Sequence, residues 1–159
     1  MIKLYKNGLP AAEYHEAWVS GGEVTEHWGR VGTNGETRTH IADPKLDDDA
    51  NIERALAGAR SRGFDELGED DERTLLVEYS ITGMGNANDV DKRHRLEDKL
   101  NEVLGWTGLG HCDGGSIGSG TMEACCFVAD FEVAAAVIRE ALVGTEFADF
   151  SRIYDEREE

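Results

Sequence analysis

The sequence predicts an α+β fold in two parts, because two different successions of strand and helix patterns follow one another along its 159 residues. Residues 1–67 contain short strand patterns separated by glycine-containing turn sequences, and they end in one amphipathic helix pattern. Residues 74–159 follow another order: strand, helix, strand, strand, helix, strand. Residues 68–73 form an acidic, strand-averse run, so we predict a short linker there.

Turn sequences divide the first part into strands. The pair Asn-Gly at two places and the triplet Ser-Gly-Gly are hairpin signals, and strand-forming residues alternate with polar ones between them. The expected strands cover residues 2–5, 14–19, 23–31 and 35–42. We expect them to form one antiparallel sheet.

A helix is predicted to follow, beginning at the triplet Asp47-Asp48-Asp49. Carboxylates at this position can cap free N–H groups and favour the positive end of the helix dipole. Ile52, Leu56 and Ala59 lie at helical spacing on one face, and Gly63 is expected to end the helix. The triplet also offers oxygen ligands for a hard cation, but it lacks the glycine and distal glutamate of a Ca²⁺ loop. We therefore predict capping and no metal site.

In the second part, two strand–helix units surround a hairpin. The helices are expected to begin at Asp89 or Asp91 and at Asp130, whose side chains can cap them. The expected strands cover residues 75–81, 108–113, 122–129 and 151–155. This order indicates the split βαβ, ferredoxin-like arrangement, in which four antiparallel strands carry both helices on one face.

A glycine-rich segment, GGSIGSG over residues 114–120, joins the two middle strands. It leads into a strand and no Lys-Ser/Thr follows, whereas phosphate-binding loops lead into a helix N-terminus. We therefore predict a flexible, uncharged hairpin tip, where the backbone of a partner can approach closely. Gly115, Ser116 and Gly118 are its candidate binding residues.

Next to this segment lie residue types that suit zinc binding or nucleophilic catalysis: His111, Cys112, Cys125 and Cys126. They have no C-x-x-C spacing, and adjacent residues of a strand point to opposite faces. We therefore predict buried core thiols, with no metal and no cofactor. An odd number of cysteines, three, also argues against a disulfide scaffold.

The charge balance is strongly acidic: 16 basic against 33 acidic residues give a net charge of −17. Residues 1–67 contain eight basic and 12 acidic residues, a balance of −4, and residues 68–159 contain eight and 21, a balance of −13. A field of this sign repels phosphate backbones and attracts basic surfaces. Alternatively, the acidity serves only solubility or reflects a salt-adapted host.

The densest basic cluster, Lys92, Arg93, Arg95 and Lys99, is interleaved with acidic residues on the first predicted helix of the second part. We predict that these cations pair with carboxylates of the same helix and need no phosphate partner.

Localisation is expected to be cytoplasmic, with no membrane association. No window approaches the roughly 18 consecutive apolar residues that span a bilayer. The N-terminal segment also lacks the apolar core, about 7–15 residues long, of a secretory signal.

Residues 1–67 resemble the WGR domain. The resemblance rests on the stretch HWGRVGTNGETR over residues 27–38, on the hairpin strands before and after it, and on a helix ending near SRGFDEL. It implies a small antiparallel sheet with one helix. The family is best known from DNA-dependent poly(ADP-ribose) polymerases, where the domain holds a broken DNA end. By this resemblance, Trp28 would stack on a terminal nucleotide and Arg30 would couple domains. Trp28, Gly29 and Arg30 are therefore the candidate residues for binding a partner or DNA.

Trp28 and Arg30 also have a purely structural interpretation, which we favour. Large aromatic side chains in strands usually serve packing, so the Trp28 ring is expected to lie mostly buried between the sheet and the Asp49–Arg62 helix. Arg30 is then expected to be partly exposed and paired with a nearby acid. A Trp28 ring more than half exposed would instead favour the binding interpretation.

Residues 74–156 resemble, more weakly, small ferredoxin-like bacterial domains of the immunity-protein type. Together with the acidity, this indicates a non-catalytic protein-binding module, most concretely an immunity protein or inhibitor that caps a basic toxin or a nucleic-acid-directed enzyme. One alternative is a WGR protein that binds DNA ends, and another is an enzyme using a thiol or carboxylate near residues 111–113.

Overall fold

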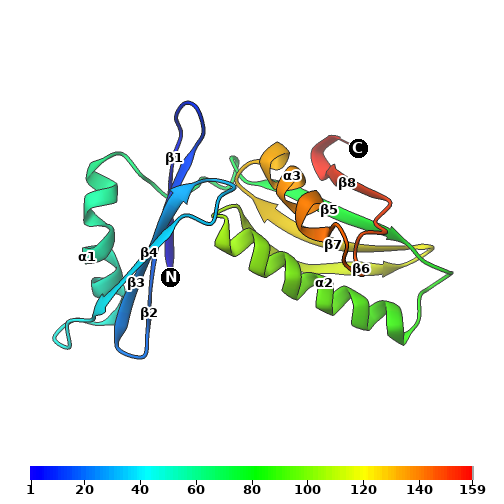
Figure 1. Ribbon diagram of the computed structural model, residues 1–159, viewed down its shortest axis with the longest axis horizontal. Coiled ribbons are helices and arrows are strands. Elements are labelled where there is room, and N and C mark those ends of the chain that lie inside the picture. The colour runs from blue at the N-terminus through cyan, green and yellow to red at the C-terminus, as the bar shows by residue number, and fades with distance from the viewer. Residues whose placement is uncertain (159) are drawn as a thin grey trace. The chain divides into compact units, whose positions relative to one another are not determined.

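The computed structural model describes residues 1–158 and divides into two compact units, Met1–Gly68 and a second unit that begins at Glu69 (Figure 1). Each unit combines a four-stranded antiparallel sheet with helices, so the predicted α+β class is confirmed. The division falls within the acidic run over residues 68–73, and the last residue of that run already belongs to a strand. Within the described part of the chain, no helix combines the length and apolar character needed to cross a membrane.

In the N-terminal unit, four strands pair in sequence order. They are β1 at Ile2–Lys6, β2 at Glu13–Ser20, β3 at Glu23–Arg30 and β4 at Glu36–Ile41. Between β2 and β3, Gly21 and Gly22 both have positive φ angles, 58° and 79°, as a two-residue type I′ turn requires. Here the turn residues correctly predicted where the strands lie and that strands adjacent in sequence pair with each other.

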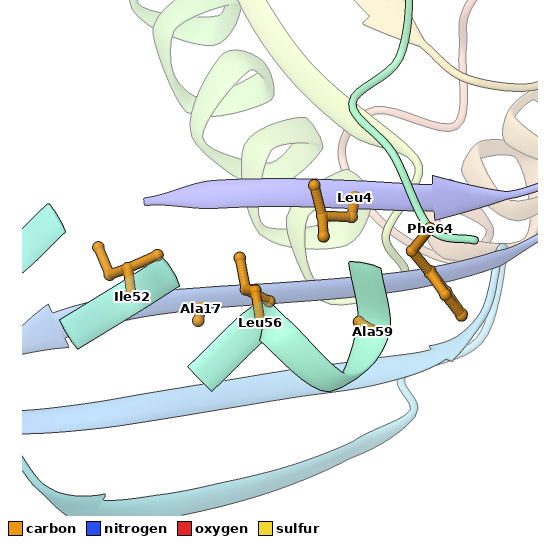
Figure 2. Close-up of a cluster of buried hydrophobic side chains, with 6 residues drawn as sticks. All are labelled: Leu4, Ala17, Ile52, Leu56, Ala59 and Phe64. Atoms are coloured by element: carbon orange, nitrogen blue, oxygen red, sulfur yellow. The ribbon is translucent and has the colours of Figure 1, made fainter. Parts of the chain in front are cut away.

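Helix α1, Asp48–Ser61, covers one face of this sheet (Figure 1). Its N-cap is Asp47, whose carboxylate accepts a hydrogen bond from the N–H group of Ala50, in agreement with the predicted capping. Figure 2 shows the core between helix and sheet, which consists of Leu4, Ala17, Ile52, Leu56, Ala59 and Phe64. Removal of these apolar side chains from water holds α1 on the sheet.

The C-terminal unit follows the predicted succession of elements. These are β5 at Arg73–Ser80, α2 at Ala87–Trp106, β6 at Gly110–Gly118, β7 at Thr121–Val128, α3 at Phe131–Leu142, β8 at Arg152–Asp155 and the 3₁₀ turn η1 at Glu156–Glu158. The strand order is β6–β7–β5–β8, and all neighbours are antiparallel. Helix α2 packs on β6 and β7, and α3 packs on β5 and β8. Since the helices also contact each other, they cover the same face (Figure 1).

Strict alternation along β7 builds the core of this unit. Its buried side chains are Met122, Ala124, Cys126 and Val128, and the residues between them are only partly buried. The helices contribute Leu96, Leu100, Leu104, Ala134, Ile138 and Leu142. Each position of β7 that faces the helices is therefore apolar, as a half-buried strand requires.

The start of α2 differs from the prediction, which placed the cap at Asp89 or Asp91. The N-cap is Asn86, whose side chain accepts hydrogen bonds from the N–H groups of Asn88 and Asp89. The Asp89 carboxylate in turn accepts from the N–H group of Asn86, which completes a capping box. The helix therefore begins earlier, because the expected cap residue acts as the third residue of the first turn.

The glycine-rich segment 114–120 was wrongly predicted as a flexible hairpin tip. Strand β6 continues through it to Gly118, and only Ser119 and Gly120 form the turn. A β-bulge between Cys112 and Gly115 shifts the register, after which Gly115 lies opposite Ala124. A β-carbon on Gly115 would collide with the carbonyl oxygen of Glu123, so glycine permits close pairing here and does not break the strand.

Candidate functional site

Strand register places Trp28 on the face of the N-terminal sheet that α1 covers. Trp28 lies opposite His15, which is two residues from the core residue Ala17 and therefore on the same face. The Trp28 side chain is partly buried and less than half exposed, so the criterion that would have overturned the packing interpretation is not met. It thus has neighbours to pack on and a surface that remains open.

Two side chains hold the Trp28 ring. The imidazole of His15 stacks on it, with 5.6 Å between ring centroids and an interplanar angle of 28°. The guanidinium of Arg38, in β4, lies 5.8 Å from the Trp28 ring centroid. Arginine over an indole ring is a favourable cation–π arrangement, so Trp28 is oriented by its neighbours.

The aromatic contacts continue from Trp28 to the end of α1. His15 meets the Phe64 ring edge-on at 6.1 Å, and the cations of Lys6 and Arg62 lie 5.9 Å and 5.7 Å from the Phe64 centroid. We use the name aromatic–cation surface for this group of six residues: Lys6, His15, Trp28, Arg38, Arg62 and Phe64. It joins β1, β2, β3, β4 and the segment after α1 in one place.

A buried carboxylate supports this surface from within the sheet. Glu26 is only 2% exposed, and its Oε2 accepts hydrogen bonds from Nε and Nη2 of Arg38 at 3.1 Å and 2.7 Å. His15 Nε2 lies 3.3 Å from the other oxygen, Oε1. One carboxylate therefore fixes both side chains that contact the Trp28 ring.

The surroundings of His15 favour the uncharged form of its imidazole. Burial lowers the pKa of its imidazole, and the nearby cations Arg62 and Arg38 lower it further, against the opposing effect of Glu26. Because a carboxylate only accepts hydrogen bonds, the neutral ring carries its proton on Nε2. His15 thus behaves here mainly as an aromatic plate with one hydrogen-bond donor.

Arg30 is exposed and lies on the same face as Trp28, two residues further along β3. Its predicted pairing with an acid is wrong: among residues 1–158, no carboxylate lies within 4 Å of the Arg30 guanidinium. The strand register does place Glu13 opposite it, and Lys6 opposite Glu13. Arg30 is therefore a cation available to a ligand, next to the aromatic–cation surface.

Gly29, between the tryptophan and the arginine, has a structural role. A β-carbon there would come within 2.8 Å of the Gly35 Cα and 3.2 Å of the Tyr14 hydroxyl. Gly35 has a positive φ of 61° and approaches the Trp28 carbonyl closely. The loop 31–35 therefore folds onto β3 at two glycines. The Trp-Gly-Arg sequence combines a partly buried ring, a glycine required by close packing and an exposed cation.

The opposite face of the same strands carries a network that the sequence did not reveal. His27 is 1% and Glu16 3% exposed, and His27 Nδ1 lies 2.7 Å from Glu16 Oε1. Lys3 Nζ pairs with the second oxygen of Glu16 at 3.2 Å. Cross-strand register explains the contact, since Glu16 and His27 are direct partners in β2 and β3.

This network also holds the loop that follows the Trp-Gly-Arg sequence. His27 Nε2 lies 2.6 Å from the carbonyl oxygen of Asn34, and the Tyr14 hydroxyl donates to the carbonyl oxygen of Thr33 at 2.9 Å. Both nitrogens of the His27 ring thus lie beside oxygen atoms, and the Tyr14 hydroxyl is also 3.0 Å from Nε2. Burial, and then the charge of Glu16, raise the pKa of Tyr14, so its hydroxyl remains a donor.

Comparison of the chain with protein-family models, with curated proteins and with solved structures finds no significant match. The candidate site is therefore defined by its own geometry.

In the C-terminal unit, the other predicted binding residues lie on an edge strand. Gly115, Ser116 and Gly118 are in β6, paired with Ala124, Glu123 and Thr121 of β7. The Ser116 hydroxyl donates to the Glu123 carboxylate at 3.3 Å. They are therefore accessible along one strand edge and not in a mobile loop, and their binding role stays a prediction.

The histidine and cysteines near this strand do not converge on a metal position. Cys112 and Cys126 are buried, whereas Cys125 is partly exposed on the opposite face of β7. In the part of the chain that the structure describes, no three His, Cys, Asp or Glu side chains are placed to hold a metal ion.

Nearly all cations of the C-terminal unit are committed to contacts within it. Within residues 69–158, six of the eight basic residues form ion pairs: Arg73 with Asp155, Lys92 with Asp149, Arg93 with Glu97, Arg95 with Glu146, Lys99 with Glu102 and Arg152 with Glu78. A seventh, Arg157, donates to the main-chain carbonyls of Asp70 and Glu72. The prediction for α2 is thus half right, because Lys92 and Arg95 pair with the segment after α3.

A pocket with a volume of about 290 Å³ lies at the start of α3. Its lining contains one basic residue, Arg73, and four acidic ones: Asp71, Asp130, Glu132 and Glu158. Arg73 is already paired with the buried Asp155, and Asp130 caps α3 through the N–H group of Val133. The remaining carboxylates give this hollow a negative charge.

Proposed function

We propose that the protein is a non-catalytic binding module whose acidic C-terminal unit docks onto a basic protein. The observation that carries the proposal is the distribution of ion pairs in that unit. Nearly all of its cations are used internally, and its sequence contains 21 acidic residues but only eight basic ones. The surplus negative charge is therefore uncompensated and available to a partner.

The concrete form of the proposal is an immunity protein or inhibitor that caps a basic toxin or a nucleic-acid-directed enzyme, as the resemblance of residues 74–156 suggests. Such a partner has a cationic cleft for phosphates, and an acidic protein competes for that cleft. Long-range attraction between opposite charges accelerates association, and salt weakens it. Rapid, salt-sensitive binding is thus the expected behaviour.

The pocket at the start of α3 is a suitable first contact for a lysine or arginine of the partner. Glu132 and Asp71 are exposed at its rim, while Arg73 stays neutralised by Asp155. A cation entering the pocket meets carboxylates from two segments of the unit. This arrangement favours a basic side chain over a phosphate.

Capture from a bacterial lysate at low salt, followed by affinity measurement with the isolated partner, tests the proposal. Glu132→Lys and Glu140→Lys form a matched pair, because both are exposed residues of α3 and change the net charge equally. Reversal at the pocket, Glu132→Lys, is expected to weaken binding about tenfold, and Glu140→Lys much less. Recovery of no protein, or of nucleic acid alone, would remove the proposal, and equal effects of the two variants would remove the pocket from it.

A second candidate function, binding of nucleic-acid ends, is favoured by one observation. In the aromatic–cation surface, Trp28 retains an open surface beside Arg38 and the unpaired Arg30. An aromatic ring can stack on a terminal base while nearby guanidinium groups contact phosphates, and the WGR resemblance points to the same residues. The carboxylates of Glu13 and Glu36 in the neighbouring strands oppose such a ligand.

Binding of a short blunt DNA duplex at low salt tests this second function. Trp28→Ala is expected to weaken binding at least tenfold, since stacking of a base on an aromatic side chain contributes about 1–3 kcal/mol. Trp18→Ala is the matched control, because Trp18 lies in β2 on the opposite face of the sheet. No detectable duplex binding at low salt would exclude the function.

A further inference from the structure

We propose that Cys112 and Cys126 are a redox-active thiol pair that hydrogen peroxide converts into an intrachain disulfide between β6 and β7. This modification is independent of the proposed binding function. It rests on strand register, on the direction of the side chains and on the position of Cys112 at an irregular strand edge.

Register makes the two cysteines direct neighbours. Cys112 of β6 lies opposite Cys126 of β7. Hydrogen-bonded and non-hydrogen-bonded pairs alternate along an antiparallel ladder, and the N–H group of Ala129 donates to the carbonyl of Leu109. Leu109 and Ala129 are therefore a hydrogen-bonded pair. Because the two types alternate, the pair of Cys112 and Cys126, three positions further along the ladder, is a non-hydrogen-bonded pair.

A second contact confirms this type of pair. The N–H group of Cys112 donates to the side-chain oxygen of Asn101 in α2, at 2.9 Å, and so is not used in the ladder. Cα atoms of a non-hydrogen-bonded pair are about 4.5 Å apart, closer than in the alternate pair type. This separation lies within the range of about 4.4–6.8 Å that a disulfide bond spans.

Both thiols point to the same side of the sheet, under the helices. Cys112 is 7% and Cys126 0% exposed, whereas Cys125 projects from the other face. A hydrogen bond between the two thiols lowers the pKa of Cys112, against burial and the charges of Glu97 and Asp113, and raises that of Cys126. Cys112 is thus the better thiolate of the two, and Cys126 the adjacent resolving thiol.

The surroundings of Cys112 admit a small oxidant. Strand β6 is at the edge of the sheet, and the bulge between Cys112 and Gly115 opens the ladder beside it. The Cys112 thiol lies 3.6 Å from the carbonyl oxygen of Gly114, the residue within this bulge. Hydrogen peroxide is small enough to react with a thiol at such a strand edge, whereas a bulky disulfide such as oxidised glutathione requires a wider opening.

The reaction balances in two steps. The Cys112 thiolate attacks one oxygen of hydrogen peroxide, an S–O bond forms as the O–O bond breaks, and the hydroxide that leaves takes up the thiol proton as water. The sulfur of Cys126 then attacks the sulfenic acid sulfur, an S–S bond forms, and the oxygen leaves as a second water with the Cys126 proton. Both thiols are oxidised by one peroxide molecule, which is reduced to two waters.

The test is treatment of the reduced full-length protein with a small excess of hydrogen peroxide, followed by alkylation in denaturant, proteolysis and mass spectrometry. The expected product is a monomer lighter by two hydrogen atoms, with a peptide containing Cys112 linked to one containing Cys126. Dithiothreitol is expected to restore both thiols. The Cys125→Ala variant should give the same product, and Cys126→Ala should accumulate a Cys112 sulfenic acid that dimedone traps.

Three results would overturn the proposal. They are a disulfide that includes Cys125, oxidation of Cys125 while Cys112 and Cys126 remain reduced, and conversion of Cys112 to sulfinic acid with Cys126 still a free thiol. A disulfide that includes Cys125 can be detected in the unmodified protein, because this protein contains all three cysteines as free thiols.

Discussion

The two faces of the β2–β3 pair contain the same two residue types in different surroundings. On one face, His27 and Glu16 are buried and hold the loop 31–35. On the other, His15 and Glu26 support Trp28 and Arg38 at the aromatic–cation surface. The sequences His-Glu in β2 and Glu-His in β3 are reversed copies, so alternation sends one imidazole and one carboxylate to each face.

The difference between the faces lies in the other partners of each imidazole. Both His27 nitrogens face oxygens of the sheet and of the loop 31–35, whereas His15 lies beside Arg38 and Arg62 and has a pKa that burial, above all, lowers. One pair is therefore a buried clamp on the loop 31–35, and the other is a stacking platform for Trp28. The same two residue types therefore have different roles because their surroundings differ. This difference motivates four predictions.

The largest effect is expected for His27→Ala. The substitution leaves the buried Glu16 carboxylate and the Asn34 carbonyl without their hydrogen-bond partner, and each unsatisfied group costs about 1–3 kcal/mol of unfolding free energy. His15→Ala is the matched control and should cost only about 1–2 kcal/mol, the range of an unmade hydrogen bond. Urea unfolding monitored through the amide signals of β2 and β3 measures both. A His15→Ala cost equal to that of His27→Ala would contradict the clamp-and-platform distinction.

Trp28→Ala should have the next largest effect, about 2–3 kcal/mol. This is below the 3–5 kcal/mol of a fully buried tryptophan, because Trp28 is only partly buried. Trp28→Phe retains a ring to stack on His15 and should recover part of the loss. The same unfolding measurement applies, and a cost below about 0.5 kcal/mol would show that Trp28 serves binding alone.

The pH dependence of stability reports on the His15 imidazole. The pKa of His15 is lowered in the folded protein, so below its ordinary value of about 6.5 the unfolded chain binds a proton that the folded chain does not. The contribution of neutral His15 is therefore complete above that value and is lost as the pH falls through it. His15→Gln should flatten the stability profile between pH 7 and 5, by less than about 1.4 kcal/mol per pH unit. An unchanged profile would mean that His15 titrates normally.

The smallest effect on stability is expected for Arg30→Ala, within about 0.5 kcal/mol, because the side chain is exposed and unpaired. Arg38→Ala is the informative contrast, since it removes two hydrogen bonds from buried Glu26 and should cost about 1–3 kcal/mol. Thermal unfolding of the two variants measures the difference. A large loss for Arg30→Ala would reveal a structural role that its position does not suggest.

Local signals predicted the elements of the fold well. The Gly21-Gly22 turn, the Asp47 cap and the Asp130 cap act through neighbouring residues, so their meaning is contained in a short stretch of sequence. The α2 cap was misplaced because Asn86 and Asp89 are both good caps, and the capping box uses them together. The strand character of residues 114–118 was missed because it depends on β7, which allows no β-carbon at Gly115.

The candidate site was only partly predictable. The Trp-Gly-Arg stretch drew attention to Trp28 and Arg30, but the stretch contains neither Phe64 nor Lys6, which reach the surface from distant parts of the chain. The imidazole–carboxylate pairs depend on register between strands. A reversed His-Glu and Glu-His in successive hairpin strands is the signal that could have revealed them.

The position of β5 has a consequence for how the C-terminal unit is made on the ribosome. β5 is the first strand of the unit in sequence, yet it lies between β7 and β8, and its partner β8 is the last. Until residues 152–155 have emerged from the ribosome, one edge of the long apolar strand β5 is unpaired. Arg73 also lacks its ion-pair partner Asp155 during this time. Chains that stall before Arg152 should therefore aggregate through β5, and proteolysis or sedimentation of such truncated chains would detect it. Completion of the unit thus coincides with completion of its last strand.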